Sequence, residues 1–523
     1  MTMIRSQMVE RIFQQGEEPW DILIIGGGAT GVGTAVDAAS RGYNVVLLER
    51  SDFGKGTSSR STKLVHGGVR YLQQGNVTLV MEALKERGIL LKNAPHLVHD
   101  LGFVVPNYDW WEAPFYGIGM KVYDMLARKY GFKRSRLLSS EEVRKRIPTV
   151  AEKGLRGGVL YYDGQFDDAR LLINLVQTAA RQGATLVNHF PCTDLLLNEE
   201  GFVEGAVGLE LESGRRAEIR ARCVVNATGA FTDSVLRMSE PDAPTMIAPS
   251  QGVHVVLDRS FLPGETAIMV PRTSDGRVMF AIPWHGHVVV GTTDTPVDEA
   301  TLEPRPLEHE IDFILETAGE YLVKAPGRGD VLSTFAGIRP LVRTAEGTGT
   351  AVLSRDHTIH INKAGLLSIF GGKWTTYRKM AEDCVDHAVM LGRLEERPCV
   401  TRTLNVHGYH RHADNFGDLA FYGSDAPRVK ALMSSEPGLG KRLHEALPVY
   451  AGQMVWAVRE EMARTVDDAL ARRTRALQLN ARAALEMAPA VARLMAAELG
   501  RDEEWQTQQV QAFQELARGY LLD

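Results

Sequence analysis

The chain has 523 residues, of which 44% are hydrophobic and 24% charged, so it can form two or three globular domains and lacks the composition of a disordered chain. Its net charge of −6 and the absence of a long Lys and Arg block argue against nucleic acid as a partner. The four cysteines, at 192, 223, 384 and 399, form no C-x-x-C pair, so the sequence indicates neither a metal site nor a disulfide framework, and a reducing compartment fits.

No segment reads as a signal peptide or a membrane span. Charges interrupt the first twenty residues, which lack an apolar core. No later apolar run approaches the roughly 20 residues that cross a bilayer. The sequence therefore predicts a protein that is neither exported nor integral to a membrane.

The most informative stretch is 21–52, DILIIGGGATGVGTAVDAASRGYNVVLLERSD. An apolar strand, 22–25, runs into Gly26, Gly28 and Gly31 in the G-x-G-x-x-G spacing, and a helix follows. Gly26 permits the turn, Gly28 admits a pyrophosphate close to the backbone, and Gly31 lets the helix lie on the strand. A second apolar run, 45–48, ends in Glu49, where an acidic residue accepts from a ribose hydroxyl. These features predict a bound adenine dinucleotide.

The next two segments each allow two interpretations. Residues 51–68 are rich in Ser, Thr and Gly, so they form either a flexible connection or a loop that wraps the cofactor. Residues 107–136 crowd aromatic and basic side chains around an apolar stripe at Ile118, Val122, Met125 and Leu126. That stripe predicts a helix that either caps the core or binds a membrane surface or partner.

Later segments return to the cofactor. We expect a helix over 171–179, a strand over 184–188, and a strand over 223–225 that ends in Ala-Thr-Gly. Short β-rich runs between 252 and 292 predict an antiparallel sheet, and 307–322 a helix. A last strand, 366–370, ends in Gly-Gly-Lys, a second anion-facing helix start. Beyond about 398 the Ala-, Arg-, Glu- and Leu-rich composition predicts a separate helical domain, in which Thr465 and Asp468 resemble a capping box.

In this order, the chain carries LIIGGGATGVGTAVDAASRGYNVVLLER, TSSRSTKLVHGGVRYLQQGN, LKNAPHLV, DDARLL, NATGAFTD, AGIRPL and FGGKWTTYRKMAE. These motifs closely resemble those of the FAD-dependent (aerobic) glycerol-3-phosphate dehydrogenases. The stretch 460–481 also resembles that family's C-terminal helical domain, and the resemblance covers nearly the whole chain. The aromatic stretch near Trp110 and the last twenty or so residues depart from the family pattern.

The resemblance implies an α/β fold with a Rossmann-like FAD-binding domain of the glutathione-reductase or amine-oxidase type. We expect that domain at 1–100, 150–245 and 335–397, an antiparallel β-rich substrate domain at 101–149 and 246–334, and the helical domain at 398–523. The resemblance also implies oxidation of sn-glycerol 3-phosphate to dihydroxyacetone phosphate, with hydride transfer to the flavin and electrons passed to a quinone. A cytoplasmic protein, peripheral at the inner face of the membrane, would fit that acceptor, and a homodimer stays open.

The resemblance also implies roles for single residues. His254 is assigned as the general base, with a buried core histidine of the strand 253–257 as the alternative, and Arg339 as the group that stabilises the developing alkoxide. A phosphate of charge about −1.5 to −2 calls for cations, and the expected substrate-binding residues are Arg70, Tyr71, Arg355 and Lys373. The expected cofactor-binding residues are Gly26, Gly28, Gly31, Glu49, Thr57, Ser58, Ser59, Lys63, Leu64, His66, Gly67, Gly68, Thr228, Gly229, Gly337, Gly372, Lys373 and Thr375.

Two other functions stay open. One is an oxidase of the same flavin class that gives its electrons to oxygen, with an amino acid or amine as a further substrate class. The other is a non-catalytic flavin-binding protein whose helical domain recruits partners. The cluster of Arg and Lys disfavours both an amine substrate and a pure scaffold.

Overall fold

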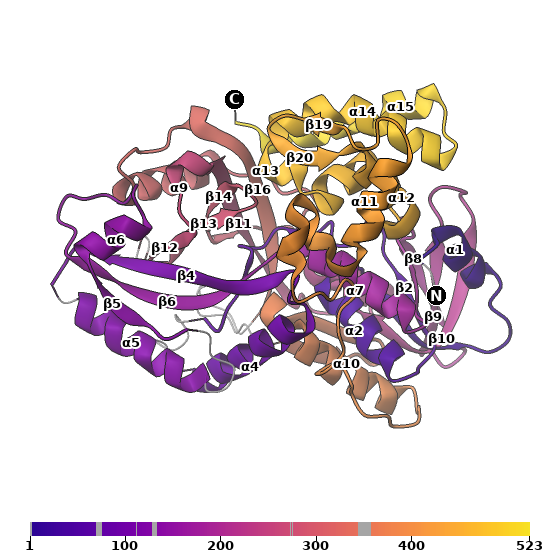
Figure 1. Ribbon diagram of the computed structural model, residues 1–523. Coiled ribbons are helices and arrows are strands. Elements are labelled where there is room, and N and C mark those ends of the chain that lie inside the picture. The colour runs from indigo at the N-terminus through magenta and orange to yellow at the C-terminus, as the bar shows by residue number, and fades with distance from the viewer. Residues whose placement is uncertain are drawn as a thin grey trace.

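The computed structural model describes residues 3–68, 76–110, 112–127, 133–271, 273–274, 276–343 and 357–522. Two large sheets lie side by side, and the C-terminal helices, orange to yellow in Figure 1, sit against both. Three of the expected substrate-binding residues, Arg70, Tyr71 and Arg355, lie outside these ranges. The fold class expected from the resemblance is confirmed.

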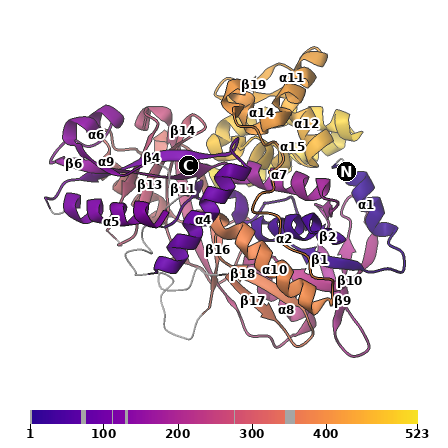
Figure 2. The same ribbon diagram turned by 60° about the horizontal axis from the view of Figure 1, so that its bottom comes forward.

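The first sheet is built around the glycine-rich stretch. Its central strands run in the order β18-β10-β1-β2-β7 and pair in parallel, with every residue of 22–25 almost fully buried. Helix α2 packs against α7 and α10 on this sheet (Figure 2). The strands are β1 (Trp20–Ile25), β2 (Val45–Leu48), β7 (Thr185–Val187), β8 (Cys192–Leu197), β9 (Val203–Leu209), β10 (Arg216–Asn226), β17 (His357–Ile361) and β18 (Leu367–Gly371). The helices are α1 (Arg5–Phe13), α2 (Ala29–Ser40), α7 (Asp168–Arg181), α8 (Thr232–Ser239) and α10 (Tyr377–Leu391).

The second sheet is mostly antiparallel, as the β-rich runs predict. Its order is β15-β11-β14-β13-β12-β4-β6-β3, with β16 paired to β11 and β5 to β6. The strands are β3 (Leu64–Val65), β4 (Val98–Asn107), β5 (Arg136–Ser139), β6 (Gly157–Phe166), β11 (Ile247–Asp258), β12 (Thr266–Val270), β13 (Met279–Trp284), β14 (His287–Gly291), β15 (Thr295–Pro296) and β16 (Val331–Val342). The helices beside it are α4 (Val77–Asn93), α5 (Glu112–Ala127), α6 (Ser140–Arg146) and α9 (Glu308–Tyr321).

The chain crosses between the two sheets more often than the expected domain ranges suggest. Strand β6, inside the range 150–245, pairs with β4 in the second sheet, and β16, which overlaps 335–397, pairs along its length with β11. Pairing across a sheet, and not sequence position, therefore decides where these strands lie. The domain boundaries stay a prediction.

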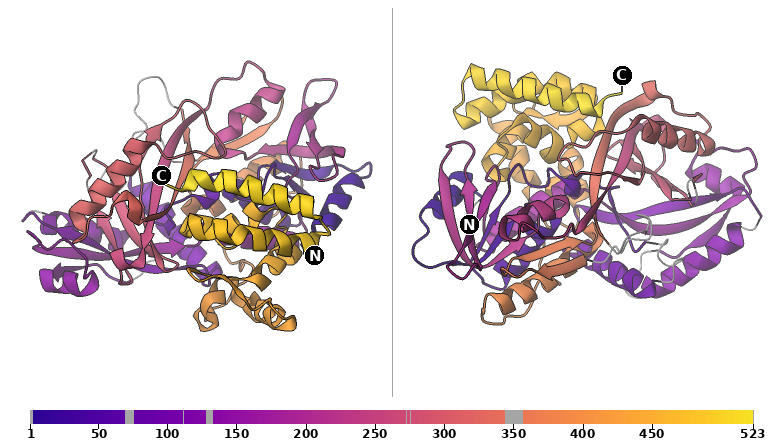
Figure 3. Two further views of the ribbon diagram at one scale, coloured as in Figure 1. Left: turned by 90° about the horizontal axis from the view of Figure 1, so that it is seen from above. Right: turned by 180° about the vertical axis from the view of Figure 1, so that it is seen from behind.

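The C-terminal part is helical apart from one small hairpin. It contains α11 (Ala426–Ser435), β19 (Arg442–His444), β20 (Leu447–Tyr450), α12 (Ala451–Glu461), α13 (Ala476–Leu479), α14 (Ala481–Leu499) and α15 (Glu503–Ala517). Helices α14 and α15 pack side by side (Figure 3). Thr465 and Asp468 exchange side-chain and backbone hydrogen bonds at the start of the helix Asp468–Arg473, which is the geometry of a capping box.

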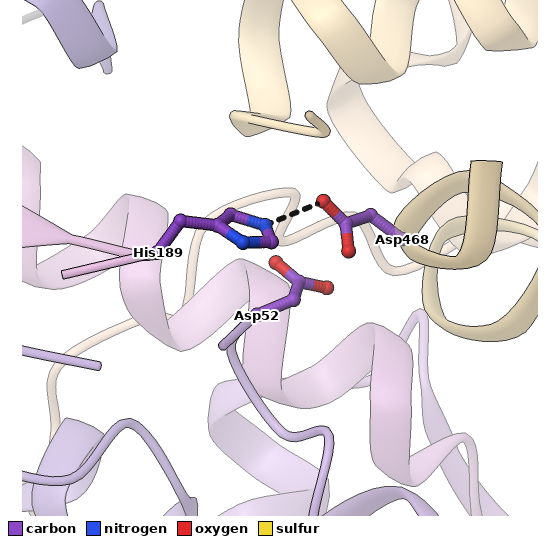
Figure 4. A group of neighbouring side chains, drawn as sticks. All are labelled: Asp52, His189 and Asp468. Carbon is purple, nitrogen blue, oxygen red and sulfur yellow. Dashed lines mark hydrogen bonds and ion pairs between the residues drawn. The ribbon is translucent and has the colours of Figure 1, made fainter. Parts of the chain in front are cut away.

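A buried ion-pair network joins this helical part to the first sheet. Asp52 accepts hydrogen bonds from Arg472 Nε at 2.5 Å and from Arg473 NH1 at 2.6 Å, and all three side chains are buried. His189 Nε2 lies 3.0 Å from Asp468 Oδ2 beside them (Figure 4). The grouping of Asp52, His189 and Asp468 resembles a set of metal ligands. Because Arg472 already pairs with both carboxylates and Arg473 pairs with Asp52, we interpret it as an ion-pair network.

Replacing Asp52 by Asn should lower the free energy of unfolding by about 3–5 kcal/mol, because two buried guanidiniums would lose their shared carboxylate. Burial alone would raise the pKa of Asp52, but Arg473 and Arg472 lower it below the ordinary value. Its stabilisation is therefore present at neutral pH and is lost as the pH falls through the lowered pKa.

Denaturant unfolding at pH 7 measures this effect. The matched control is Asp312→Asn, which breaks an exposed pair with Arg328 and should cost less than about 1 kcal/mol. Equal unfolding midpoints for the two variants would contradict the importance assigned to the buried network.

Candidate active site

The turn between β1 and α2 brings two backbone segments into close approach. Gly26 has a φ of +113°, and a Cβ there would lie 2.6 Å from the carbonyl oxygen of Ala227, just beyond β10. A Cβ at Gly31 would overlap the carbonyl oxygen of Gly26. Gly28 is the N-cap of α2 and has no side chain of its own to cap the helix, while Ser58 Oγ accepts from the amide of Ala29. Sterics therefore require Gly at 26 and 31, as the motif spacing predicts.

Glu49 lies beside this turn, at the end of β2. Its carboxylate accepts from the backbone amide of Gly27 at 2.6 Å and from that of Ser51 at 2.8 Å. Burial raises the pKa of Glu49, while these two amides favour the ionised form. The carboxylate is thus fixed next to the glycine turn, in the place where a ribose hydroxyl would meet it.

A cavity of about 280 Å³ opens where the first sheet's parallel strands end. The glycine turn, the segment 54–58, the segment 227–231 and the Gly-Gly-Lys turn after β18 all line it, so the three separate glycine-bearing stretches converge as predicted. The expected cofactor residues in its lining are Gly26, Gly28, Glu49, Thr57, Ser58, Thr228, Gly229, Gly372 and Lys373.

Other expected cofactor residues support the cavity without lining it. Thr375 Oγ1 accepts from the amide of His66, and the amide of Gly67 donates to Tyr123 Oη. Gly337 packs on Arg60, where a Cβ would lie 3.0 Å from the Cβ of Arg60. Ser59 is buried in the loop behind the lining.

Lys63 is expected to bind the cofactor, but in the structure it does not line the cavity. Its ammonium is fully buried and donates to both carboxylate oxygens of Asp168, each at 2.9 Å, and it lines neither this cavity nor the one beside it. Burial lowers the pKa of Lys63 although Asp168 opposes the shift. In this structure Lys63 supports the loop 57–63 through its bonds to Ser59 and Asp168. The sequence pattern alone could not distinguish that position from one facing the cofactor.

A second cavity, of about 160 Å³, lies next to the first. Pro340 lines the first cavity and its chain neighbour Arg339 lines the second. Arg339 lies on β16 and donates to the carbonyl oxygen of Thr293 at 2.9 Å and to Asp294 Oδ1 at 3.2 Å. Its guanidinium is only partly exposed, and it lies beside a buried carboxylate. The expected residues that line this cavity are Leu64, His66, Gly68 and Arg339.

His254, on β11, is buried behind this second cavity and does not line it. Its Nε2 lies 3.0 Å from Thr62 Oγ1, and its ring stacks on Phe335 at 4.8 Å. Burial lowers the pKa of His254 well below its ordinary value, and the positive charges of Lys63 and Arg339 lower it further. The imidazole is therefore neutral at pH 7. Its hydrogen-bond partner Thr62, and not His254 itself, lines the cavity.

The sequence analysis missed most of the polar groups in the second cavity. Asp163, Arg277 and Asp294 line it together with Thr62, which lies in the loop expected to wrap the cofactor, and the four residues come from separate segments of the chain. Asp163, Arg277 and Asp294 fall in no motif of the sequence. Strand pairing brings them together, so only the run Thr-Thr-Asp-Thr after β14 offered a local signal of polar groups.

The residues around the first cavity fit an adenine dinucleotide such as FAD. Gly28 places no capping side chain over the start of α2, and the first turn of that helix contains no acidic side chain to repel a pyrophosphate. Glu49 offers the ribose acceptor, and the 54–58 loop and Lys373 line the space beyond. This set of groups defines a flavin-dependent oxidoreductase.

Comparison with known proteins gives the same class. The family model described as FAD dependent oxidoreductase matches residues 21–378, and the model of the C-terminal domain of alpha-glycerophosphate oxidase matches residues 369–506. A glycine oxidase structure from Geobacillus kaustophilus has a TM-score of 0.53 at 19% identity, covering 74% of this chain and 98% of that chain, and it shows the shared fold alone.

Closer relatives are similar along nearly the whole chain. A probable mitochondrial glycerol-3-phosphate dehydrogenase from Caenorhabditis elegans is 42% identical, with 97% of this chain and 74% of that protein covered. The human mitochondrial glycerol-3-phosphate dehydrogenase is 40% identical, with 99% and 75% covered. The structure of glycerol-3-phosphate dehydrogenase from Bacillus halodurans, complexed with FAD, has a TM-score of 0.80 at 30% identity, with 98% and 97% covered. The chain belongs to the family of FAD-dependent glycerol-3-phosphate dehydrogenases.

Replacing Gly31 by Ala should abolish or strongly reduce flavin binding, because the added methyl group would overlap the backbone of the turn and push α2 off the strand. Flavin absorbance per protein after purification measures the effect. Gly329→Ala is the control, since a Cβ there meets nothing within 4 Å. Full flavin content in Gly31→Ala would contradict the steric account of the turn.

Proposed function

We propose that the protein oxidises sn-glycerol 3-phosphate to dihydroxyacetone phosphate and passes the electrons to a quinone. The observation that carries the proposal is the Arg339 guanidinium at the wall of a polar cavity next to the flavin cavity. Membership of the glycerol-3-phosphate dehydrogenase family supports the choice of substrate. A scaffold protein would have no use for a partly buried cation in that position.

The chain's residues would bind and orient the substrate. When bound, FAD would supply the acceptor for the hydride from C2 of the substrate. Arg339 and Arg277 line the second cavity and Lys373 the first, so positive groups are available for a phosphate dianion and for the oxygen that develops negative charge at C2. Arg70, Tyr71 and Arg355 stay predicted substrate contacts.

The proton of the C2 hydroxyl also needs an acceptor. Thr62 Oγ1 lines the cavity and lies 3.0 Å from the neutral imidazole of His254, so the hydroxyl of Thr62 can take the substrate's proton as its own moves to Nε2. His254 would then act as the base through Thr62, without touching the substrate itself. This refines the role that the sequence resemblance implies for His254.

Steady-state assays of the purified protein with glycerol 3-phosphate test the function and the electron acceptor. We expect turnover with a soluble quinone under anaerobic conditions, with little hydrogen peroxide formed in air. The match to a C-terminal domain described from an alpha-glycerophosphate oxidase keeps oxygen as the second candidate acceptor. Rapid peroxide formation and no quinone reduction would favour the oxidase, and no oxidation of the substrate with either acceptor would contradict the proposal.

Arg339→Ala should lower kcat/KM for glycerol 3-phosphate by about ten- to a hundredfold, since a charged hydrogen bond is worth roughly 1.5–3 kcal/mol. Lys373→Ala should act in the same direction. Flavin content should persist in Arg339→Ala, because that guanidinium does not line the first cavity. Wild-type kinetics in both variants would show that the phosphate and the alkoxide are bound elsewhere.

Thr62→Val and His254→Gln should each lower kcat by roughly a hundredfold, with a smaller effect on KM. That factor is at the low end of the rate loss expected when a general base is removed. Because the pKa of His254 is well below its ordinary value, kcat of the wild type should show no acid limb from an imidazole near pH 6.5. Profiles of kcat against pH for the three proteins measure this. An acid limb near pH 6.5 that disappears in His254→Gln would contradict the buried, neutral state.

We also propose that the outer face of α5 contacts the membrane in which a quinone resides. Phe115, Ile118 and Met125 are 54%, 66% and 68% exposed on this helix, and Trp110 just before it is 76% exposed. The opposite face of α5 packs Tyr116 and Met120 against the second sheet. Among the described residues, α5 therefore caps the core with one face and leaves a second apolar face exposed, which supports membrane contact in addition to the capping role.

One residue of the expected stripe lies elsewhere. Leu126 packs beside Val80, Leu84 and Tyr123 between α5 and α4, so it contributes to the core and not to the outer face. Lys133, Arg134 and Arg136 are exposed nearby and could meet anionic headgroups. In the described part of the chain, no helix is both long and apolar enough to cross a bilayer.

Changing Phe115, Ile118 and Met125 together to Ser should abolish co-sedimentation with vesicles, because the apolar contact area would be lost. Changing Lys133, Arg134 and Arg136 to Gln should weaken binding to anionic vesicles only, and salt should mimic that change. Leu211→Ser, an exposed apolar residue in the β9–β10 turn, is the control. No binding by the wild type to either kind of vesicle would contradict membrane contact through α5.

A further inference from the structure

One segment of the C-terminal helical part, residues 467–478, lies along the loop that lines the flavin cavity. Asp467 pairs with Lys55 at 2.8 Å, and Lys55 itself lines that cavity. Arg472 and Arg473 hold Asp52 at the start of the same loop. The helical part therefore reaches the flavin site at several points and is more than a remote attachment.

Gln478, on α13, makes the most direct of these contacts. Its side chain is buried, its Nε2 donates to the carbonyl oxygen of Ser59 at 2.6 Å, and its Oε1 accepts from Lys63 Nζ at 3.2 Å. Lys63 Nζ donates to the same Ser59 carbonyl at 2.7 Å. One amide thus ties together the backbone of the loop and the buried ammonium that supports it.

The loop is fixed from its other side by the flavin-binding domain. Ser58 Oγ accepts from the amide of Ala29, at the start of α2, at 2.9 Å. The carbonyl oxygen of Ser58 accepts from Trp374 Nε1 at 2.8 Å. Ser58 lines the flavin cavity and Ser59 is its neighbour, so contacts on two consecutive residues come from the flavin-binding domain and from the C-terminal helical part.

The backbone of this loop needs such support. Lys63 has a φ of +63°, in the left-handed region that a residue other than Gly adopts only where its surroundings hold it. Asp168, on α7, and Gln478 are among the groups that hold the Lys63 side chain. Without Gln478, the Ser59 carbonyl would keep only the hydrogen bond from Lys63. The loop would then be held less firmly where it faces the cofactor.

We propose that Gln478 is a positioning residue of the flavin site, through which the C-terminal helical part fixes the loop 57–63 against the cofactor. It acts through Ser59 and Lys63 and does not itself line the flavin cavity. The proposal rests on FAD as the cofactor of this family and does not depend on the identity of the substrate or the electron acceptor.

The test compares flavin release from holoenzyme of the wild type, Gln478→Ala and Gln478→Glu. Fluorescence of the released flavin during dialysis gives the dissociation constant, and the visible absorption spectrum at saturating FAD reports the surroundings of the bound ring. Gln478→Ala should raise the dissociation constant roughly tenfold, as expected for losing about two buried hydrogen bonds, and should shift the spectrum. Gln478→Glu should behave similarly, because a carboxylate cannot donate to the Ser59 carbonyl.

The matched control is Glu461→Gln, which weakens a different buried contact of the same helical part. Glu461 pairs with Arg170 on α7, and neither residue lines the flavin cavity or bonds to the loop 57–63. This variant should lower the unfolding temperature while the flavin dissociation constant and the spectrum stay close to those of the wild type.

Two results would overturn the proposal. One is wild-type flavin affinity and spectrum in Gln478→Ala, and the other is an equal change in Glu461→Gln, which would assign the effect to general docking of the helical part. Failure of glycerol 3-phosphate to reduce the flavin would contradict the proposed function but would leave the flavin-release comparison unaffected.

Discussion

The close approach of backbone to backbone at the β1–α2 turn is the constraint on which the site depends. Gly31 has no room for a side chain over the carbonyl of Gly26, and Gly26 has none beside Ala227. This contact fixes the start of α2 relative to the ends of β1 and β10. Because the strands of the sheet are parallel, the Glu49 carboxylate and the later Gly-Gly-Lys turn are delivered to the same edge.

Two cations lie near the buried His254 beside the second cavity. The second sheet contributes Arg339, and the loop 57–63 contributes Lys63. Burial lowers the pKa of His254 below its ordinary value, and both cations lower it further. Lys63 is balanced by Asp168 and Arg339 by Asp294, so each cation keeps a carboxylate partner within the protein. The arrangement leaves a neutral imidazole next to a hydroxyl that lines the cavity, in surroundings suited to an anionic substrate.

Local sequence patterns predicted the parts of the structure that depend on local sterics. The spacing of Gly26, Gly28 and Gly31 with Glu49 predicts the turn, and the resemblance to a known family predicts Arg339 at the second cavity. Asp163 and Asp294 were missed because strand pairing, which no periodicity encodes, brings them to the second cavity. The resemblance predicts Lys63 at the cofactor and the periodicity predicts Leu126 on the apolar stripe of its helix, whereas the structure buries the Lys63 side chain and packs the partly buried Leu126 between α5 and α4. Sequence spacing cannot show which way a side chain in a loop or on a two-faced helix will turn.

The most direct test of the central claim is anaerobic mixing of the holoenzyme with glycerol 3-phosphate in a stopped-flow spectrophotometer, without any electron acceptor. The account predicts that the visible absorbance of the flavin bleaches in a single turnover, at a rate that saturates with glycerol 3-phosphate. Glycerol, which lacks the phosphate, and glycine, an amine, should leave the flavin oxidised on the same timescale. Bleaching by glycine, or equal rates with glycerol and glycerol 3-phosphate, would contradict a site built for a phosphorylated alcohol.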